Sequence, residues 1–498
     1  IVYRDMDRLT DAIESMTLCV DKDGENHEFQ RVLDELKKDK EEDETLPADH
    51  PERERFEHLL TWLREGGALF PKLKMRYYSE NYRGVHALRD VRKDECCLYI
   101  PKSHIITLEM AKAAPVGSKM VAADLSLISP KHSYLSTYLL QEKRNSESFW
   151  QPYIDILPKS FDTFPIFYSE EEKEWLIGSP FLNLVNEKIG DIEIDYKAII
   201  EVAPEFEEYT LEEFSWARMC VCSRIFGMQI DGVKTDGFVP LADMLNHKRP
   251  RQTSWTYSDE KTGFIIETLE EISRGDQIMD SYGRKCNSRF LLNYGFIVDN
   301  NDGNEYALKV SYNESDPYIE QKKQLIQDEH DTRTFKIMGD ATEQIFADFL
   351  GYIRFLELND DFSKSLPILM ESLGGEDRKL RATNTPPLTI KNEKATWKRV
   401  KSLCLEALDK YHSSLEDDEE LFADETKKLK LNHRNCMKMR MGEKEILNWY
   451  IDLADISLEL IDMTAKDIRK RVTSKYVTRT FDEYLNSTIL PLVRKGNQ

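Results

Sequence analysis

The spacing of apolar residues divides the N-terminal part of the chain into helical and strand-forming stretches. Helical spacing runs through residues 1–38, and again through residues 56–62, which lead into a Gly66-Gly67 pair of the kind that ends helices. Short apolar runs at 85–88 and 96–100, with turn residues between them, predict two strands. We therefore expect an N-terminal helical arm, a charged linker, and then a small twisted β region.

In the middle of the chain the spacing of apolar residues changes twice, first to a helical period and then back to that of strands. From His104 to about Phe226 the pattern is mainly helical, and Thr210 and Glu213 have the spacing of a capping box at the start of one helix. Strand patterns return afterwards. They cover residues 237–241, 263–269 and 277–279. The sequence thus predicts a set of strands interrupted by a helical insert of more than a hundred residues.

After Asn304 the chain is again largely helical, with apolar residues three or four apart between 446 and 460. We expect an α+β protein in which small sheets with a helical insert are followed by an all-α C-terminal domain. The expected parts are an arm and acidic linker at 1–50, an α+β domain at 51–303 with its insert at about 104–226, and a helical domain at 304–498.

Charge argues against nucleic acid as a partner. The 498-residue chain holds 91 acidic residues against 69 Lys plus Arg, a formal net charge of −22. Such a balance opposes binding to phosphate backbones unless a local basic stripe exists, and we find none in the sequence. The acidic runs at 41–45 and 415–425 are typical of solvated faces or loops.

The eight cysteines form no CxxC pair, which favours a reduced intracellular protein. Cys220 and Cys222 fall within a predicted helix, so we interpret them as buried apolar residues and predict no metal site. No apolar run approaches a membrane span, and no signal-peptide pattern opens the chain. We expect a monomeric cytoplasmic or nuclear protein, with organelle targeting left open because the chain starts at Ile1.

The segment from Asp236 to Asn300 carries the strongest functional signal. It reads GFVPLADMLNH, then two apolar runs, then MDSYG and NSRFLLNYGFIVDN. Asn246, His247 and Tyr282 are polar residues embedded in apolar surroundings, and an unpaired buried polar group costs about 1–3 kcal/mol. These side chains therefore require partners, either within the protein or on a ligand.

These motifs resemble the SET-domain protein methyltransferases of the branch that includes the Rubisco large-subunit lysine methyltransferase and the actin-histidine methyltransferase. The resemblance implies a SET fold with a helical insert and S-adenosyl-L-methionine as cofactor. It also implies a helical C-terminal substrate-binding domain, which the segment MRMGEKEIL at 439–447 resembles. The expected partner is a protein substrate whose identity the sequence does not give.

The resemblance assigns the cofactor to separated segments. YSENYRGVHALRDV at 78–91 is similar to the first SET motif, so the backbone of Asn81, Tyr82 and Arg83 is expected to hold the cofactor. Families often have Gly where this chain has Tyr82, so the approach of the backbone there can differ. Asn246 and His247 are expected to bind the adenine and neighbouring atoms.

Arg224 shares a helix face with Ala217 and Val221, so its guanidinium is expected to be buried. A buried guanidinium requires an anion, and breaking such a pair costs about 3–5 kcal/mol. From the residues alone, a structural salt bridge to Asp or Glu is favoured. The resemblance implies instead the carboxylate of the cofactor's methionine moiety.

Tyrosines are the expected catalytic and channel residues. Tyr282 would place its hydroxyl beside the transferring methyl and orient the amine of the target. Tyr294 would stand on the channel wall, and Tyr257 is a second candidate for the wall. Outside the motifs, each of the three would be interpreted as an ordinary core or strand-end residue.

The residues at three positions indicate lysine as the target. Histidine-methylating members carry an Asn two residues after the helix Arg, a Trp before the Asp-Met pair, and a Ser where Tyr294 lies. This chain has Phe226, Ala242 and Tyr294 there. An apolar wall suits the methylenes of lysine and a methylammonium, whereas Asn can bind an imidazole nitrogen. Histidine methylation and a non-catalytic SET-fold scaffold stay open as alternatives.

Overall fold

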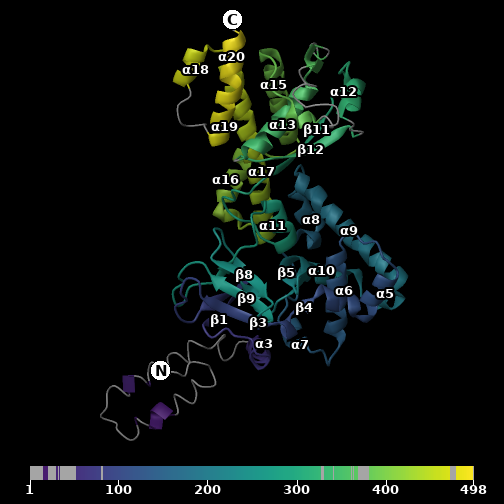
Figure 1. The fold of residues 1–498 in the computed structure, drawn as a ribbon, viewed down its shortest axis with the longest axis vertical. Helices are drawn as coiled ribbons and strands as arrows, with labels where there is room; N and C mark the ends of the chain where they lie inside the picture. Colours follow the sequence, from purple (N-terminus) through teal and green to yellow (C-terminus); the bar gives the residue numbers. More distant parts are fainter. Residues whose placement is uncertain are drawn as a thin grey trace. The chain divides into compact units, whose positions relative to one another are not determined.

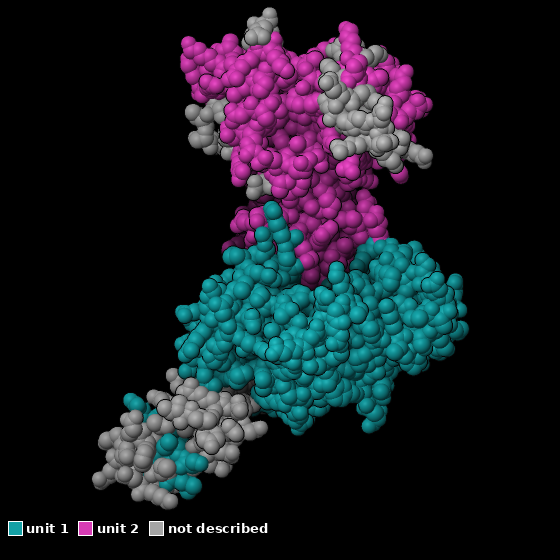
Figure 2. All heavy atoms as spheres, viewed as in Figure 1, with its two compact units in different colours: residues 1–161, 188–284 teal, residues 162–187, 285–498 magenta. Residues whose placement is uncertain are grey.

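The computed structural model describes residues 15–18, 20, 30, 31, 33, 52–79, 82–326, 330–339, 341–359, 362, 364–367, 381–471 and 478–496. The predicted N-terminal arm therefore lies largely outside the described residues, as does Asn81. The described chain forms two compact units, coloured teal and magenta in Figure 2. Unit 1 comprises residues 1–161 and 188–284, and unit 2 comprises residues 162–187 and 285–498.

Unit 1 is built around small sheets (Figure 1). Three are antiparallel, and the short pair β7–β10 is parallel. The strands are β1 (Leu73–Ser79) with β2 (Tyr82–Ala87), β3 (Cys96–Pro101) with β9 (Gly263–Thr268) and β8 (Thr253–Ser258), β4 (Ile106–Thr107) with β6 (Val233–Phe238) and β5 (Ile225–Ile230), and β7 (Asn246–His247) with β10 (Met279–Asp280).

Helices cover residues 108–224 between these strands, as the apolar spacing predicts. The predicted capping box is confirmed, because the Thr210 hydroxyl accepts from the Glu213 amide (3.1 Å) and the Glu213 carboxylate accepts from the Thr210 amide (2.8 Å). The helices from residue 53 to 224 are α3 (Arg53–Glu65), η1 (Lys102–His104), α4 (Leu108–Ala113), α5 (Pro115–Ala122), α6 (Pro130–Arg144), α7 (Gln151–Ile154), η2 (Pro165–Phe167), α8 (Glu170–Glu174), α9 (Pro180–Val202), η3 (Pro204–Glu208) and α10 (Leu211–Arg224), and η4 (Ala242–Met244) follows β6.

Unit 2 is mostly helical, with one antiparallel hairpin of β11 (Tyr306–Ser311) and β12 (Thr332–Ile337) that the sequence pattern did not predict. Its helices are α11 (Asn287–Tyr294), α12 (Ile319–Ile326), α13 (Glu343–Leu356), η5 (Ala382–Asn384), α15 (Ile390–Leu408), α16 (Leu415–Ala423), η6 (Glu425–Lys427), α17 (Leu431–Ile461), α18 (Ala465–Arg471), α19 (Arg479–Tyr484), the π-helical turn η7 (Leu485–Ile489) and α20 (Leu490–Gly496). The α+β fold class is confirmed.

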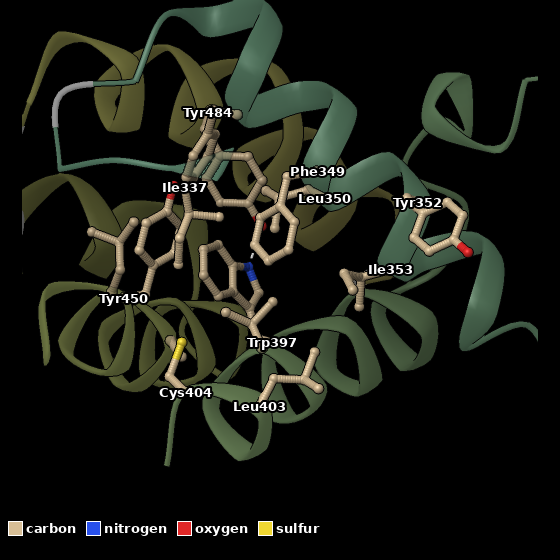
Figure 3. Close-up of a cluster of buried hydrophobic side chains, with 14 of the residues drawn as sticks. Ile337, Phe349, Leu350, Tyr352, Ile353, Trp397, Leu403, Cys404, Tyr450 and Tyr484 are labelled. Carbon is tan, nitrogen blue, oxygen red and sulfur yellow. Dashed lines mark hydrogen bonds between the residues drawn. The ribbon is translucent and has the colours of Figure 1, made fainter. Parts of the chain in front are cut away.

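The core of unit 2 gathers around Trp397, which is fully buried between α13 and α17 (Figure 3). Phe346, Phe349 and Tyr450 pack there, and the Trp397 indole donates a hydrogen bond of 2.6 Å to the hydroxyl of Tyr484. Aromatic side chains bury large apolar areas, so this cluster holds the separate helices of the unit together.

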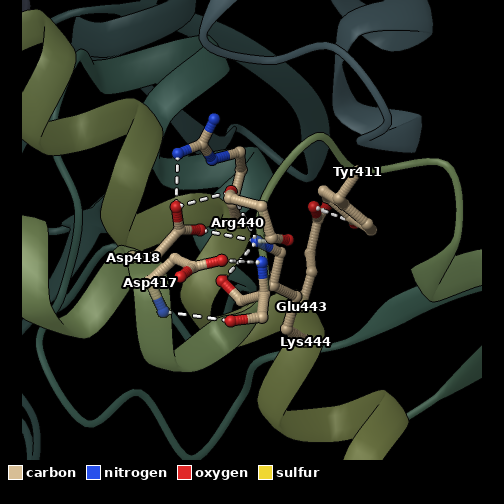
Figure 4. A network of polar contacts seen from close by, with 8 residues as sticks. Tyr411, Asp417, Asp418, Arg440, Glu443 and Lys444 are labelled. Atoms are coloured by element: carbon tan, nitrogen blue, oxygen red, sulfur yellow. Dashed lines mark hydrogen bonds and ion pairs between the residues drawn. The ribbon is translucent and has the colours of Figure 1, made fainter.

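A buried polar network lies beside this core, on the MRMGEKEIL segment of α17 (Figure 4). Asp418 accepts hydrogen bonds from Arg440 and Lys444, and each donor lies 2.7 Å from its acceptor oxygen. Glu443 accepts from Ser179 Oγ (2.9 Å) and from the Tyr411 hydroxyl (2.8 Å). Burial raises the pKa of Glu443 to about 7, because its charged form loses hydration that its neutral partners replace only in part.

Candidate functional site

The parallel pair β7–β10 brings the two polar motifs of the sequence together. Asn246 lies opposite Met279, and His247 lies opposite Asp280. Beyond this pair, the Tyr282 amide donates to Nδ1 of His247 (3.0 Å) and the Tyr282 hydroxyl donates to the carbonyl of Leu245 (2.8 Å). The two rings stack with centroids 5.1 Å apart. Because Nδ1 accepts, a neutral His247 carries its proton on Nε2.

Asn246 joins this site to the β1–β2 hairpin. Its side-chain amide donates to the backbone carbonyl of Arg83 (2.8 Å) and to Oε1 of Gln277 (3.3 Å). Gly84 permits this approach, because a Cβ there would lie 2.3 Å from Gln277 Nε2 and 3.1 Å from Asn246 Nδ2. The predicted cofactor residues Arg83, Asn246 and His247 are therefore neighbours in unit 1.

Arg224 ends α10, and its guanidinium has a carboxylate partner within the protein. Its Nη1 lies 2.9 Å from Oδ2 of Asp243, and the Tyr153 hydroxyl donates to the same oxygen over 2.8 Å. Burial by itself lowers the pKa of Arg224, but the adjacent Asp243 charge outweighs it, so the pKa lies above its usual value. The salt bridge favoured from the residues alone is thus present, and a role towards the cofactor stays a prediction.

Two polar atoms of this pair have no partner among the described residues. Arg224 Nε and Asp243 Oδ1 are both buried and make no hydrogen bond there. Buried groups of this kind are rare, because an unmade hydrogen bond costs about 1–3 kcal/mol. One atom is a donor and the other an acceptor on an anionic group. Together they suit a ligand that carries a carboxylate and an ammonium, as an amino acid does.

The charge around this pair also suits an anion. The side chain of Arg83 donates to the Ile156 carbonyl (2.7 Å) and packs on the Phe56 ring. Burial and the nearby charge of Arg224 lower the pKa of Arg83 to about 10. Two guanidiniums therefore lie close together beside Asp243, and a further carboxylate would relieve their repulsion.

The apolar candidates of unit 1 lie on strands β5 and β8 and in η4. Phe226 makes edge contacts with Trp255 and Phe264, with ring centroids 5.2 and 5.0 Å apart. Tyr257 is buried and lies opposite Phe264 in the β8–β9 pair. Ala242 is buried in η4. Phe226 is thus part of an aromatic cluster, and its expected place beside a substrate stays a prediction.

The remaining candidates are Tyr82 and Tyr294. Tyr82 is half exposed on β2 and stacks on Tyr78, with ring centroids 4.7 Å apart. Tyr294 ends α11 in unit 2, where its ring contacts Phe290 and Phe296. Because Tyr294 and Tyr282 belong to different units, the channel-wall role of Tyr294 also stays a prediction.

Sequence reasoning did not single out Tyr153, Asp243 or Gln277. Asp243 lies inside the quoted motif PLADMLNH, so its place next to the Asn-His pair was available as a signal. Tyr153 and Gln277 are 93 and 31 residues from Asn246 along the chain, and only folding brings them to the site.

Within the described residues, no three His, Cys, Asp or Glu side chains come together in a way that could hold a metal ion. Within the same ranges, no helix is both long and apolar enough to cross a membrane.

Family models match two parts of the chain. Residues 82–283 match the SET domain, and residues 313–447 match the Rubisco LSMT substrate-binding domain. Curated relatives include the actin-histidine N-methyltransferase of Mus musculus, 27% identical over 455 residues that cover 88% of this chain and 75% of the relative. That of Gallus gallus is 27% identical over 421 residues, 81% of this chain and 69% of the relative.

Solved structures share the fold. The SET domain of LSMT bound to lysine and AdoHcy superimposes with a TM-score of 0.68 at 22% identity, covering 87% of this chain and 99% of that one. Rubisco LSMT bound to AdoMet gives a TM-score of 0.65 at 23% identity, covering 86% and 99%. The chain thus combines a SET domain with a Rubisco LSMT substrate-binding domain, is similar in sequence to actin-histidine N-methyltransferases, and shares the fold of Rubisco LSMT.

Proposed function

We propose that this chain transfers the methyl group of S-adenosyl-L-methionine to the side-chain amine of a lysine in a protein substrate. The observation that carries the proposal is the contact of Tyr282 with His247 and Leu245, which joins the two most specific motifs at one place. A SET domain followed by a substrate-binding domain supports the same activity.

The residues around Arg224 fit the amino-acid end of this cofactor. Arg224 Nε would donate to its carboxylate, and Asp243 Oδ1 would accept from its ammonium, which would satisfy both buried atoms. Asn246 and His247 would hold the adenosine end. When bound, the cofactor supplies a methyl group on a positively charged sulfur.

Tyr282 would position the target amine. Its hydroxyl proton is used in the bond to Leu245, so the oxygen can accept a hydrogen bond from an N–H of the amine. This contact would turn the nitrogen lone pair towards the methyl group, and alignment of that kind supplies much of the rate in methyl transfer. An apolar surrounding helps the lysine to lose its proton, because burial disfavours the charged amine.

Lysine is favoured over histidine by the residue types at the positions that are predicted to face the substrate. Phe226 and its partners Trp255 and Phe264 offer aromatic faces, and none of the three side chains carries a hydrogen-bond acceptor for an imidazole N–H. Aromatic faces attract methylene chains and methylammonium groups. Ala242 is small and buried, so the volume that a Trp would fill at this position is open to a substrate or to other side chains.

A protein-histidine methyltransferase is the second candidate. It is favoured by the curated relatives, which are named actin-histidine N-methyltransferases and are 26–27% identical to this chain. The two candidates differ only in the nitrogen that accepts the methyl group, so they predict different products from the same assay.

The test is to incubate the purified chain with labelled S-adenosyl-L-methionine and a cell lysate, then to hydrolyse the labelled proteins in acid. We expect labelled methyl-lysine. Recovery of methyl-histidine would establish the second candidate instead. If no protein is labelled and S-adenosylhomocysteine does not bind in calorimetry, the chain is a non-catalytic scaffold.

A further inference from the structure

Unit 2 contains a groove of about 750 Å³ that no part of the proposed catalytic site uses. It is lined by the first turns of α13, by the Thr385-Pro386-Pro387 segment after η5, and by α19 with the π-helical turn η7. Phe346, Leu350 and Tyr484 are buried residues of its lining. The groove therefore has an apolar floor.

This floor is held in place by buried hydrogen bonds. The Tyr484 hydroxyl donates to Oε1 of Glu393 (2.6 Å) and accepts from the Trp397 indole (2.6 Å; Figure 3). Arg354 also lines the groove. Its guanidinium donates to both carboxylate oxygens of Glu393, at distances of 2.8 and 2.9 Å. Glu393 thus neutralises the one cationic side chain among the lining residues.

The rim of the groove is acidic. Glu343, Asp348 and Glu483 all line it. The hydrogen bond that protonated Glu343 would donate to Glu483, and the negative charge of Glu483, raise the pKa of Glu343. Arg479 lies near both, 3.7 Å from Glu343 and 3.3 Å from Glu483, but its side chain is 86% exposed. Glu343 and Glu483 therefore share one exposed cation, and Asp348 adds a third carboxylate to the lining.

The π-helical turn adds a local distortion to the same surface. Leu485–Ile489 has the wider hydrogen-bond pattern of a π-helix, and Asn486 and Ser487 of this turn line the groove. Such turns are rare and occur frequently at functional sites. The side-chain amide of Asn486 and the hydroxyl of Ser487 can form hydrogen bonds with the backbone of an extended peptide.

We infer that this groove binds a lysine- or arginine-bearing segment of the protein substrate, away from the residue that is methylated. The methylenes of a basic side chain would lie on the apolar floor, and its charge would meet Glu343 and Glu483. The inference rests on the proposed function only for the identity of the partner, because the groove itself and its charge do not depend on methyl transfer.

Binding of a fluorescent Gly-Lys repeat peptide to the full chain, measured by anisotropy, tests the groove directly. We expect the Glu343→Gln, Glu483→Gln double variant to bind about three- to tenfold more weakly, since each exposed ion pair at the rim makes only a modest contribution to binding. The matched control is Glu419→Gln, Glu420→Gln, two exposed carboxylates on α16 that do not line the groove. This control should bind within twofold of the wild type.

A second variant, Ala347→Lys, places a cation on an exposed lining position and should weaken binding as well. Equal affinity for the wild type and both groove variants would overturn the inference, as would an equal loss in the α16 control. In the lysate assay, the double variant should raise KM for the labelled substrate and leave kcat unchanged. If the wild type labels a protein and the double variant shows no rise in KM, the inference about the groove is refuted and the proposed function is not. If the peptide binds and no protein is labelled, the proposed methyltransferase function is refuted and the groove is not.

Discussion

The backbone amide of Tyr282 donates a hydrogen bond to Nδ1 of His247, a residue 35 positions earlier in the chain. The same tyrosine reaches the Leu245 carbonyl with its hydroxyl. Its ring is therefore fixed at both ends, next to the Asn-His pair. A phenol held in this way keeps its oxygen at a defined point, which is what positioning a small nucleophile requires.

Tyr282→Phe removes the hydroxyl and keeps the ring. We expect S-adenosylhomocysteine to bind with unchanged affinity in calorimetry, while kcat for methyl transfer falls about 10²-fold or more. Tyr99→Phe is a matched control, because that phenol also donates to a backbone carbonyl, of Lys261, over 2.8 Å. The control should keep its turnover. Loss of S-adenosylhomocysteine binding in Tyr282→Phe would contradict the positioning role.

Asp243→Asn removes the charge that balances Arg224. Because a buried guanidinium would then lack its carboxylate, we expect a loss of about 3–5 kcal/mol in the free energy of unfolding by urea. Asp236→Asn is the control, since Asp236 pairs with Lys131 at 2.8 Å and the two side chains are 22% and 45% exposed. That change should cost less than about 1 kcal/mol. Similar losses in the two variants would show that other groups compensate the charge of Arg224 when Asp243 is neutral.

Glu443→Gln should change how stability depends on pH. The pKa of Glu443 in the folded protein is about 7, above its usual 4.5, so the folded state holds this proton more tightly than the unfolded state does. Wild-type stability should therefore fall as the pH rises from about 4.5 to 7, by up to about 3 kcal/mol from this group.

The Glu443→Gln variant cannot titrate at this position, so its stability should fall less over the same pH range. Urea midpoints measured at several pH values check this, with the exposed Glu419→Gln as a control that follows the wild type. Parallel profiles for wild type and Glu443→Gln would mean that the buried carboxyl titrates normally.

Phe226→Asn introduces a hydrogen-bonding group into the aromatic cluster with Trp255 and Phe264. We expect the rate on lysine to fall by several-fold to about 30-fold, which matches the loss of about 1–2 kcal/mol of cation–π and apolar contact. Phe226→Leu keeps an apolar wall and should lose less. The ratio of methyl-lysine to methyl-histidine after hydrolysis measures the change, and an unchanged ratio would remove Phe226 from target selection.

Local sequence signals were sufficient for much of the fold. The capping box at Thr210 and Glu213, the strand at 263–268 and the apolar spacing of α17 each depend on residues only a few positions apart, so a single sequence displays them. The β11–β12 hairpin was missed because its two strands are separated by α12, and its pairing joins residues more than twenty positions apart.

Periodicity and motif spacing are local properties, so they were enough to predict the α+β class and to locate the two motifs. Which partners the motif residues meet depends on how distant segments pack. Arg224 and Tyr153 converge on Asp243, and Gln277 reaches Asn246, through hydrogen bonds between segments distant in the chain. A buried polar group must be paired, but the identity of its partner is fixed by packing, which no local pattern encodes.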